Sequence, residues 1–322
     1  MTFWELYRHT KDQVERLLSN ELTNLPALCG DCKLCAWHDS CFDWVESTDD
    51  LTGLYNLGRS KRDVITSGIG ITTIQEAVGL DIELLAERKK ADKSFLKGIG
   101  AKTLEQIKMR ADILKNAKSP VLHSELNLPR ASIEVFFDIE DDPTQDFVYL
   151  HGAFERSESG SRYLSFVARE FSEEAEKAAW LDFWHYIDSL PEGDYSVYYY
   201  ASHEKSTYRG MQRKYPELVS EERVEQFFDN PNVVDLYTNI VSRHTDWPLR
   251  SYSIKALATY LGFKWRDETP SGALSIQWFN EFLKTGDEAI LQRILKYNED
   301  DCRATMVLKD KLQELSDELV KA

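Results

Sequence analysis

The chain has 322 residues and carries 55 Asp and Glu against 39 Lys and Arg, which gives a net charge of −16. This charge argues against a protein that coats nucleic acid electrostatically, although it does not exclude an acidic site that holds cations. No run of about eighteen apolar residues is present, which excludes a transmembrane helix, and the charged N-terminus lacks a signal-peptide core, so we expect a cytoplasmic protein with no membrane partner.

Residues 1–48 are predicted to form a helix followed by a cysteine cluster. The helix is amphipathic and should end near Pro26. Four of the five cysteines then fall within a short stretch: Cys29, Cys32, Cys35 and Cys41. In a cytosolic chain such a cluster indicates a metal centre rather than disulfides, and either a zinc ion or an iron–sulfur (4Fe–4S) cluster suits four thiolates. Four free thiols are the alternative.

Residues 49–119 are predicted to form short helices around two similar segments, ITSGIGITTIQEAV (Ile65–Val78) and LKGIGAKTLEQIKMRADIL (Leu96–Leu114). In the second segment, Gly98 and Gly100 allow a turn that exposes the amides of the following helix, and Lys97 and Lys102 flank it. Residues 86–118 hold ten Lys or Arg against four Asp or Glu, a local balance of +6.

The second segment resembles a helix-hairpin-helix element, a module that grips the nucleic-acid backbone without reading its sequence. The flanking cations favour backbone binding for this copy. The first copy lacks lysines beside its turn, and there the alternative is favoured, namely a tight helix–helix corner whose isoleucine fills the core.

After a linker at Pro120–Pro129, residues 130–322 are predicted to form an α/β domain. Three antiparallel strands are expected at ASIEVFFDIE, FVYLHGAFE and SRYLSFVARE, then a helix over 172–188 and a strand at DYSVYYYAS. A short strand near NVVDLY and further helices follow. The predicted fold class is therefore an α/β mixed sheet flanked by helices, preceded by a small all-α region.

Acidic residues occupy unusual positions in two distant segments. Asp138 and Glu140 are two residues apart on the first strand, so both should point to one face of an otherwise apolar strand. In ILKYNEDDCRATMVL (Ile294–Leu308), Tyr297 and Asp301 share the apolar side of a predicted helix. Buried carboxylates need compensation, which divalent cations supply. Glu204 lies just after the YSVYYY strand.

The order of these motifs resembles that of the DEDD exonucleases of the ribonuclease H-like superfamily. Their D-x-E motif matches Asp138 and Glu140, and the Y-x3-D motif of their DEDDy-like branch matches Tyr297 and Asp301. Glu204 is the best match to the middle motif, which usually supplies an aspartate. The blocks DLY, SYSIK and YNEDDCRAT more closely resemble the C-terminal region of predicted RecB-family nucleases, and so do the cysteines in C-x2-C-x5-C spacing (Cys32, Cys35, Cys41).

This resemblance implies a nuclease that cuts single-stranded DNA or RNA from the 3′ end. Asp138, Glu140, Glu204 and Asp301 would hold two Mg²⁺ or Mn²⁺ ions about 4 Å apart, and Tyr297 would orient or help deprotonate the attacking water. The RecB-family resemblance favours iron–sulfur over zinc, with Cys29 in place of the cysteine that the family supplies from upstream. It also implies an upstream nuclease domain or a helicase as partner.

Several neighbouring residues receive lesser roles. Lys255 is expected to contact a phosphate, and Cys302 to pack in the core. Glu299 and Asp300 fall on other helix faces, where they are either exposed to solvent or in contact with the metal ligands rather than with the metal. Asp235 is expected either to cap the N-terminus of a helix or to contact the metal ligands.

Two alternatives to an active nuclease stay open. The glutamate in the middle motif could mark lost chemistry, which would leave a non-catalytic nucleic-acid-binding module. Alternatively, the domain could work only within a larger nuclease–helicase assembly.

Overall fold

A computed structural model describes residues 2–30, 32, 35–117 and 119–321 of the chain. They form two compact units, Met1–Ser119 and Pro120–Ala322. None of the helices in the described ranges combines the length and the apolarity that crossing a bilayer would require.

The first unit is helical, and most of its helices are short. Its elements are α1 (Phe3–Leu18), α2 (His38–Ser47), η2 (Leu51–Gly53), α3 (Gly58–Ile69), α4 (Ile74–Val78), α5 (Ile82–Ala91) and α6 (Ala101–Asn116). The first helix ends earlier than predicted, because Ser19 caps it and Asn20 adopts a left-handed conformation (φ 59°). No residue of α1 is buried.

The two Gly-Ile segments build the core of the first unit. Gly70 ends α3 in a left-handed conformation (φ 74°), and Gly100 directly precedes α6. Ile74, Ile99 and Leu104 are buried in one apolar cluster, to which η2 and α3–α6 all contribute. The isoleucine of the second turn thus fills the core, as a tight helix–helix corner requires.

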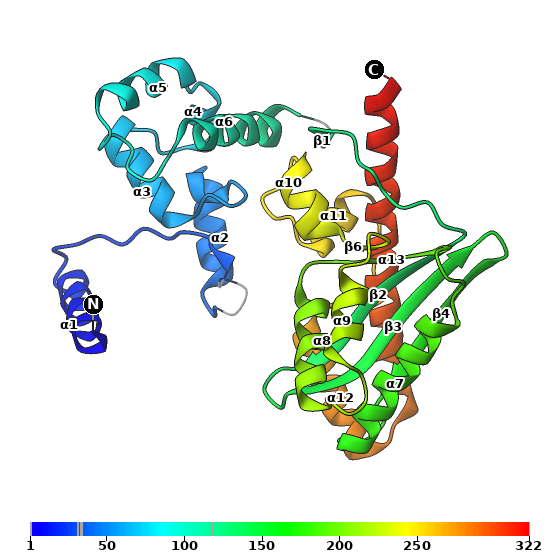
Figure 1. Ribbon diagram of the computed structural model, residues 1–322. Helices are drawn as coiled ribbons and strands as arrows, with labels where there is room; N and C mark the ends of the chain where they lie inside the picture. The colour runs from blue at the N-terminus through cyan, green and yellow to red at the C-terminus, as the bar shows by residue number, and fades with distance from the viewer. Residues whose placement is uncertain (1, 31, 33–34, 118, 322) are drawn as a thin grey trace. The chain divides into compact units, whose positions relative to one another are not determined.

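The second unit is a mixed sheet covered by helices (Figure 1). Its strands are β1 (Val121–Leu122), β2 (Ile133–Asp142), β3 (Phe147–Ser157), β4 (Gly160–Val167), β5 (Tyr195–Tyr199), β6 (Val233–Asp235) and β7 (Thr245–Asp246). Its helices are α7 (Glu173–Ser189), α8 (His203–Lys214), α9 (Glu221–Phe228), the π-helical turn η3 (Leu236–Val241), α10 (Ser242–His244), α11 (Ile254–Tyr260), α12 (Gly272–Thr285) and α13 (Glu288–Lys321).

The main sheet has the order β4-β3-β2-β5-β6. Strands β2, β3 and β4 are antiparallel, whereas β5 runs parallel to β2, and β6 runs parallel to β5. Helices α7, α8 and α9 pack on one face, and α12 and α13 pack on the other (Figure 1). The predicted α/β class, with a mixed sheet flanked by helices, is confirmed.

The stretch predicted as a linker is part of the second unit. Strand β1 pairs with β7, and Leu122 and Leu128 are buried. The backbone amide of Leu126 donates a hydrogen bond of 2.8 Å to Ser316 Oγ on α13. These contacts come from residues far along the chain, which local composition does not indicate.

Candidate active site

Strand β2 sorts its side chains between the two faces of the sheet. Val135, Phe137 and Ile139 point into the apolar core beneath α7–α9. Because successive side chains alternate on a strand, Asp138 and Glu140 emerge on the opposite face, where α13 packs. The pairing of β2 with β3 shifts register between Glu140 and Asp141 and then continues through Asp142, so the irregularity directly follows the two acids.

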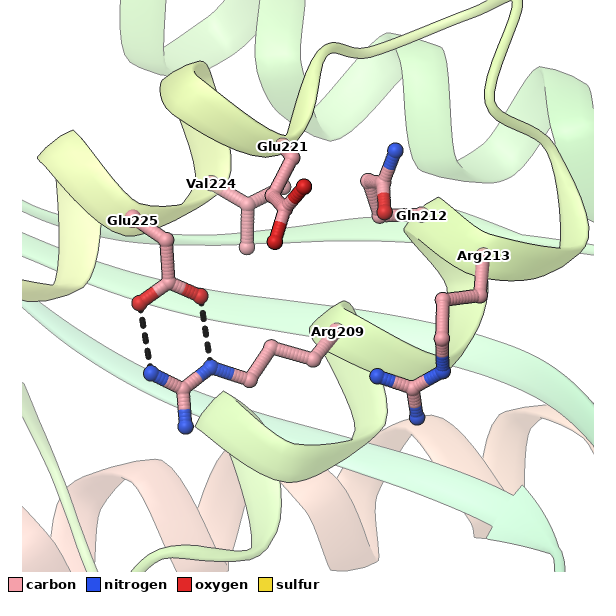
Figure 2. Close-up of a pocket in the computed structure, with 6 residues that line it drawn as sticks. All are labelled: Arg209, Gln212, Arg213, Glu221, Val224 and Glu225. Carbon is pink, nitrogen blue, oxygen red and sulfur yellow. Dashed lines mark hydrogen bonds and ion pairs between the residues drawn. The ribbon is translucent and has the colours of Figure 1, made fainter.

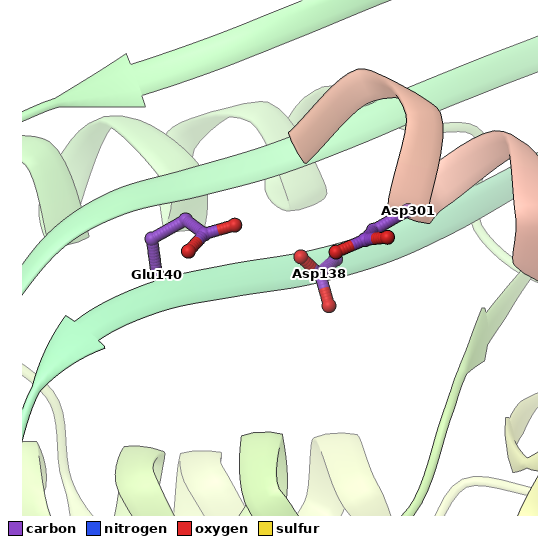
Figure 3. Close-up of side chains that lie close together, drawn as sticks. All are labelled: Asp138, Glu140 and Asp301. Carbon is purple, nitrogen blue, oxygen red and sulfur yellow. The ribbon is translucent and has the colours of Figure 1, made fainter. Parts of the chain in front are cut away.

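Helix α13 brings a third carboxylate to this face (Figure 3). One oxygen each from Asp138, Glu140 and Asp301 can be chosen so that all three lie within 4.8 Å of one another. Glu140 and Asp301 are buried, at 6% and 8% exposure, whereas Asp138 is only partly buried. Three carboxylates thus converge at the sheet surface, with Asp138 as the member most open to solvent.

Burial and mutual repulsion make this cluster costly without a counter-charge. The pKa of Asp138 is raised well above its usual range, first by burial and then by Asp301, Glu140 and Glu204. Burial and the charge of Asp301 raise the pKa of Glu140 to about 8. A set of hard oxygen donors that is crowded and short of positive charge fits divalent cations such as Mg²⁺ or Mn²⁺.

Tyr297 lies beside the carboxylates, one turn before Asp301. It is 3% exposed, and its hydroxyl accepts a hydrogen bond of 2.9 Å from Lys255 Nζ. Burial, and then the charges of Glu140 and Asp301, raise its pKa far above the ordinary value. The phenol therefore stays protonated, which suits a group that orients a neighbour better than a group that removes a proton.

Lys255 was predicted to contact a phosphate, and in the structure its ammonium group donates a hydrogen bond to the Tyr297 hydroxyl. Its Nζ lies 2.9 Å from Tyr297 Oη and 2.9 Å from the carbonyl oxygen of Pro270. Its positive charge also opposes the rise in the pKa of Asp138, Glu140 and Asp301. Lys255 is therefore a cation of the site itself.

Glu204 lies in the first turn of α8 and is 2% exposed. Its Oε2 has no hydrogen-bond partner within the described residues, and its charge contributes to the raised pKa of Asp138. It does not belong to the group of three close carboxylates. Glu204 is therefore near Asp138 and carries a free buried oxygen, but it is not in direct convergence with the other acids.

A hydrogen bond to Asp235 holds the turn that precedes the helix bearing Glu204. In the preceding turn, Ala201 adopts a left-handed conformation (φ 75°), and its amide donates to Asp235 Oδ1 at 3.1 Å. Asp235 also caps η3 through the amide of Thr238, so of its two predicted roles the N-cap is present.

Further along α8, Arg209 forms a bidentate ion pair with Glu225 of α9 (Figure 2). That pair crosses a pocket whose lining includes none of the candidate site residues.

The acids next to Asp301 serve a different purpose. Asp300 is 2% exposed, so the solvated alternative is wrong for it. Its carboxylate accepts hydrogen bonds from the backbone amide and the Nε of Arg266, at 2.8 and 2.9 Å. Glu299 accepts a hydrogen bond from the same guanidinium at 2.8 Å. Cys302 is fully buried, as predicted.

Two residues that contact the carboxylates were missed by the sequence analysis. Trp265 Nε1 donates to Asp301 Oδ1 at 2.6 Å, and Asn298 Nδ2 donates to Asp138 Oδ2 at 2.8 Å. Asn298 lies three residues before Asp301, so its position on the same side of the helix was a usable signal. Trp265 lies in a loop, where no periodicity indicates direction.

The cysteine cluster is only partly assembled in the described residues. Cys29 Sγ and Cys32 Sγ lie 3.7 Å apart. Two thiolates on one tetrahedral zinc, with bonds of about 2.3 Å, would lie about 3.8 Å apart, so this pair fits a shared metal. Cys35 and Cys41 do not complete a close group of thiols with them in the described part of the chain. Residues 31, 33 and 34, within the cluster, lie outside the described residues.

The second Gly-Ile turn presents the predicted backbone-binding residues at the surface. Gly98 has a φ of 82°, which favours glycine, and Gly100 is the residue before the first turn of α6. Lys97 and Lys102 are exposed on either side of the turn.

The five-stranded mixed sheet with acids from β2 and α13 defines an RNase H-like domain. A family model described as the RNase_H superfamily matches residues 135–313, more than half of the chain, and the chain belongs to this superfamily. No curated protein and no solved structure gave a match to the chain. Superfamily membership supports a nuclease that hydrolyses phosphodiester bonds, with nucleic acid as its substrate.

Proposed function

We propose that the chain is a metal-dependent 3′→5′ exonuclease of the DEDD type that acts on single-stranded DNA or RNA. The convergence of Asp138, Glu140 and Asp301 carries this proposal, because their oxygens approach within 4.8 Å from two distant segments. The position of Tyr297 one turn before Asp301 adds support. The polarity and the preference for single strands rest on the resemblance to DEDDy-like exonucleases.

Each residue of the site has a distinct role in this proposal. Asp138, Glu140 and Asp301 hold two Mg²⁺ or Mn²⁺ ions, with Glu204 as the fourth acid. When bound, the ions make a water more acidic and stabilise charge on the leaving 3′ oxygen. Tyr297, kept neutral by its raised pKa, orients the attacking water by hydrogen bonding, and Lys255 in turn fixes the Tyr297 hydroxyl.

The test is digestion of a single-stranded oligonucleotide labelled at its 5′ end, in Mg²⁺ or Mn²⁺. Shortening one nucleotide at a time from the 3′ end is expected for the wild type, and Asp138→Ala and Asp301→Asn should lose most of this activity. Asp182→Asn is the matched control, because Asp182 is exposed on α7. Equal cleavage by wild type, Asp138→Ala and Asp301→Asn would refute the assignment.

A nucleic-acid-binding module without activity is the second candidate. The position of Glu204 outside the group of three carboxylates favours it. A wild type that binds the oligonucleotide but leaves it intact with either metal would establish this candidate instead. An inactive chain that cleaves only together with an upstream nuclease domain or a helicase would assign it to a larger assembly, in line with the RecB-family resemblance.

We also propose that the second Gly-Ile turn contacts the nucleic-acid backbone. Several cations of the basic segment are used within the first unit: Lys89 and Lys108 bind carbonyl oxygens, and Lys115 pairs with Asp49. Four exposed lysines around the turn have no hydrogen-bond or ion-pair partner among the described residues: Lys90, Lys93, Lys97 and Lys102. Free ammonium groups beside exposed helix amides suit phosphate oxygens.

Charge reversal tests this contact. Lys97→Glu/Lys102→Glu should weaken binding of any oligonucleotide sequence and reduce the slope of log affinity against log salt by about two. Lys284→Glu/Lys321→Glu makes the same charge change at exposed lysines of the second unit and serves as the control. Equal binding by the two double variants would remove the turn from the interface.

For the cysteines, we propose a metal centre held by Cys29, Cys32, Cys35 and Cys41, with an iron–sulfur cluster favoured over zinc. The 3.7 Å separation of Cys29 Sγ and Cys32 Sγ supports a shared ligand. Anaerobically purified protein should absorb near about 400 nm and contain iron and sulfide, and Cys32→Ser should lose both. Colourless protein with one zinc per chain would reverse the choice, and metal-free protein would refute the centre.

A further inference from the structure

Asn298 forms a buried link between the sheet and the candidate metal site. It is fully buried on α13, where its Nδ2 donates to Asp138 Oδ2 at 2.8 Å. On its other side, the Tyr163 hydroxyl of β4 donates to Asn298 Oδ1 at 2.8 Å. The tyrosine hydroxyl donates its proton to Oδ1, so the amide nitrogen of Asn298 is directed to the carboxylate of Asp138. An ionised carboxylate has no proton to donate and therefore acts as an acceptor.

Gly152 provides the space for this amide. It lies directly across from Asp138 in the β2–β3 pairing. A Cβ at position 152 would fall 1.6 Å from Asn298 Oδ1 and 2.8 Å from its Cγ, which is too close for either atom to remain in place. Gly152 has no left-handed φ, so glycine is required here for the close approach and not for the backbone conformation.

We propose that Asn298 is a positioning residue for Asp138, that Tyr163 fixes the direction of its amide, and that Gly152 makes room for it. This inference rests on the proposed metal-dependent function, since the carboxylate being positioned is a candidate ligand. A hydrogen bond to one oxygen of Asp138 fixes the plane of that carboxylate. Partners of this kind orient metal ligands and strengthen metal binding.

The choice of an amide at this position also matters for charge. Asn298 donates to Asp138 Oδ2 without adding a charge of its own. An aspartate in its place would add a further negative charge to a crowded site.

The test is Mn²⁺ binding to metal-free protein, measured by titration calorimetry. Asn298→Leu keeps the approximate volume and removes both polar atoms, and Mn²⁺ affinity should fall about 10- to 100-fold. Tyr163→Phe should cause a smaller fall, because the amide remains but is free to rotate. Asn280→Leu is the matched control: its Nδ2 binds the carbonyl oxygen of Ile276 on α12, and its Mn²⁺ affinity should match the wild type.

A double-mutant cycle tests the role of Gly152. Gly152→Ala should lower Mn²⁺ affinity in the wild-type background, because the new Cβ displaces the amide. In the Asn298→Ala background the same substitution should have little effect, because the amide is already gone. Circular dichroism and thermal unfolding without metal establish that each variant is folded.

The outcomes separate the two proposals. Wild type that binds Mn²⁺ and cleaves, together with a folded Asn298→Leu of equal affinity, would overturn the positioning role and leave the nuclease standing. Wild type that neither binds Mn²⁺ nor cleaves would overturn both. If Asn298→Leu does not fold, the cycle and Tyr163→Phe decide: wild-type affinity in Tyr163→Phe, together with equal effects of Gly152→Ala in both backgrounds, would overturn the role.

Discussion

Trp265 Nε1 donates a hydrogen bond of 2.6 Å to Asp301 Oδ1, and the next residue, Arg266, binds Asp300. Two successive residues of the loop between α11 and α12 thus hold two successive acids of α13. The first contact involves a candidate metal ligand, whereas the second is an ion pair outside the group of three carboxylates. The two contacts can therefore be tested separately.

Trp265→Phe should weaken metal binding with little loss of fold. The substitution keeps an aromatic ring but removes the donor that lowers the pKa of Asp301, so the carboxylate loses its orientation and holds a proton more readily. We expect Mn²⁺ affinity to fall by about tenfold. Trp247→Phe is the control: it removes an indole hydrogen bond to Thr245 in the same unit and should lower the unfolding temperature without changing Mn²⁺ affinity.

Arg266→Ala should lower stability more than it lowers metal binding. It removes the guanidinium from a carboxylate that is 2% exposed, although the backbone amide of residue 266 still donates to Asp300. We expect the free energy of unfolding to fall by about 2 kcal/mol. Urea titration measures the effect, and Asp300→Asn/Arg266→Ala should recover part of the loss. A large fall in Mn²⁺ affinity with unchanged stability would contradict the separation of roles.

Tyr297→Phe should slow cleavage and spare the fold. The ring stays packed against Trp278, but the hydroxyl that accepts a hydrogen bond from Lys255 is lost. If the neutral phenol orients the water, the single-turnover rate at saturating metal should drop about 100-fold. Tyr195→Phe, at the start of β5, should cleave at the wild-type rate. A Tyr297→Phe protein as fast as wild type would exclude the hydroxyl from catalysis.

The stability of the metal-free protein should fall as pH rises. The pKa of Glu140 is raised from 4.5 to about 8, so between these values the folded protein keeps a proton that the unfolded chain has released. In that window the folded state binds more protons than the unfolded chain. The contribution of Glu140 to stability is therefore complete below its pKa in the unfolded chain, and it is lost as the pH rises through its pKa in the folded protein.

Urea titrations in EDTA between about pH 5 and pH 8 should show this decline for the wild type. Glu140→Gln should show a shallower decline, because it cannot release the proton. Parallel pH dependence in the two proteins would contradict the raised pKa. Saturating Mn²⁺ should restore the stability of the wild type most strongly near the upper end, where the acids are ionised.

Local patterns in the sequence predicted which face each site residue occupies, but not all of its neighbours. The period of two on a strand is a property of the backbone, so Asp138 and Glu140 could be placed on one face without knowing the sheet. The spacing of Tyr297 and Asp301 worked in the same way on a helix. The tertiary contacts of these residues depend on strand order and on helix packing. The resemblance to a known family indicated both only in outline.

The contacts that were missed show where local patterns give no guidance. Gly152 lies between His151 and Ala153 in a largely buried strand, and the side chain that requires glycine here belongs to Asn298, 146 positions further along the chain. Trp265 lies in a loop, and the path of that loop determines that its indole points to Asp301. Likewise, Pro120–Pro129 has the composition of a linker, and its contacts with β7 and α13 show that it belongs to the second unit.

The hydrogen bond between Leu126 and Ser316 places the first segment of the second unit against its last helix, 190 residues further along the chain. This bond therefore links two segments near the ends of the unit, because Leu126 lies six residues after Pro120 and Ser316 lies six residues before the last residue of the chain. A short engineered peptide could join these ends, and new termini could be opened in the exposed turn at Glu158–Ser159 between β3 and β4. Circular permutation would thus allow the carboxylate site to be studied in a chain whose ends lie elsewhere.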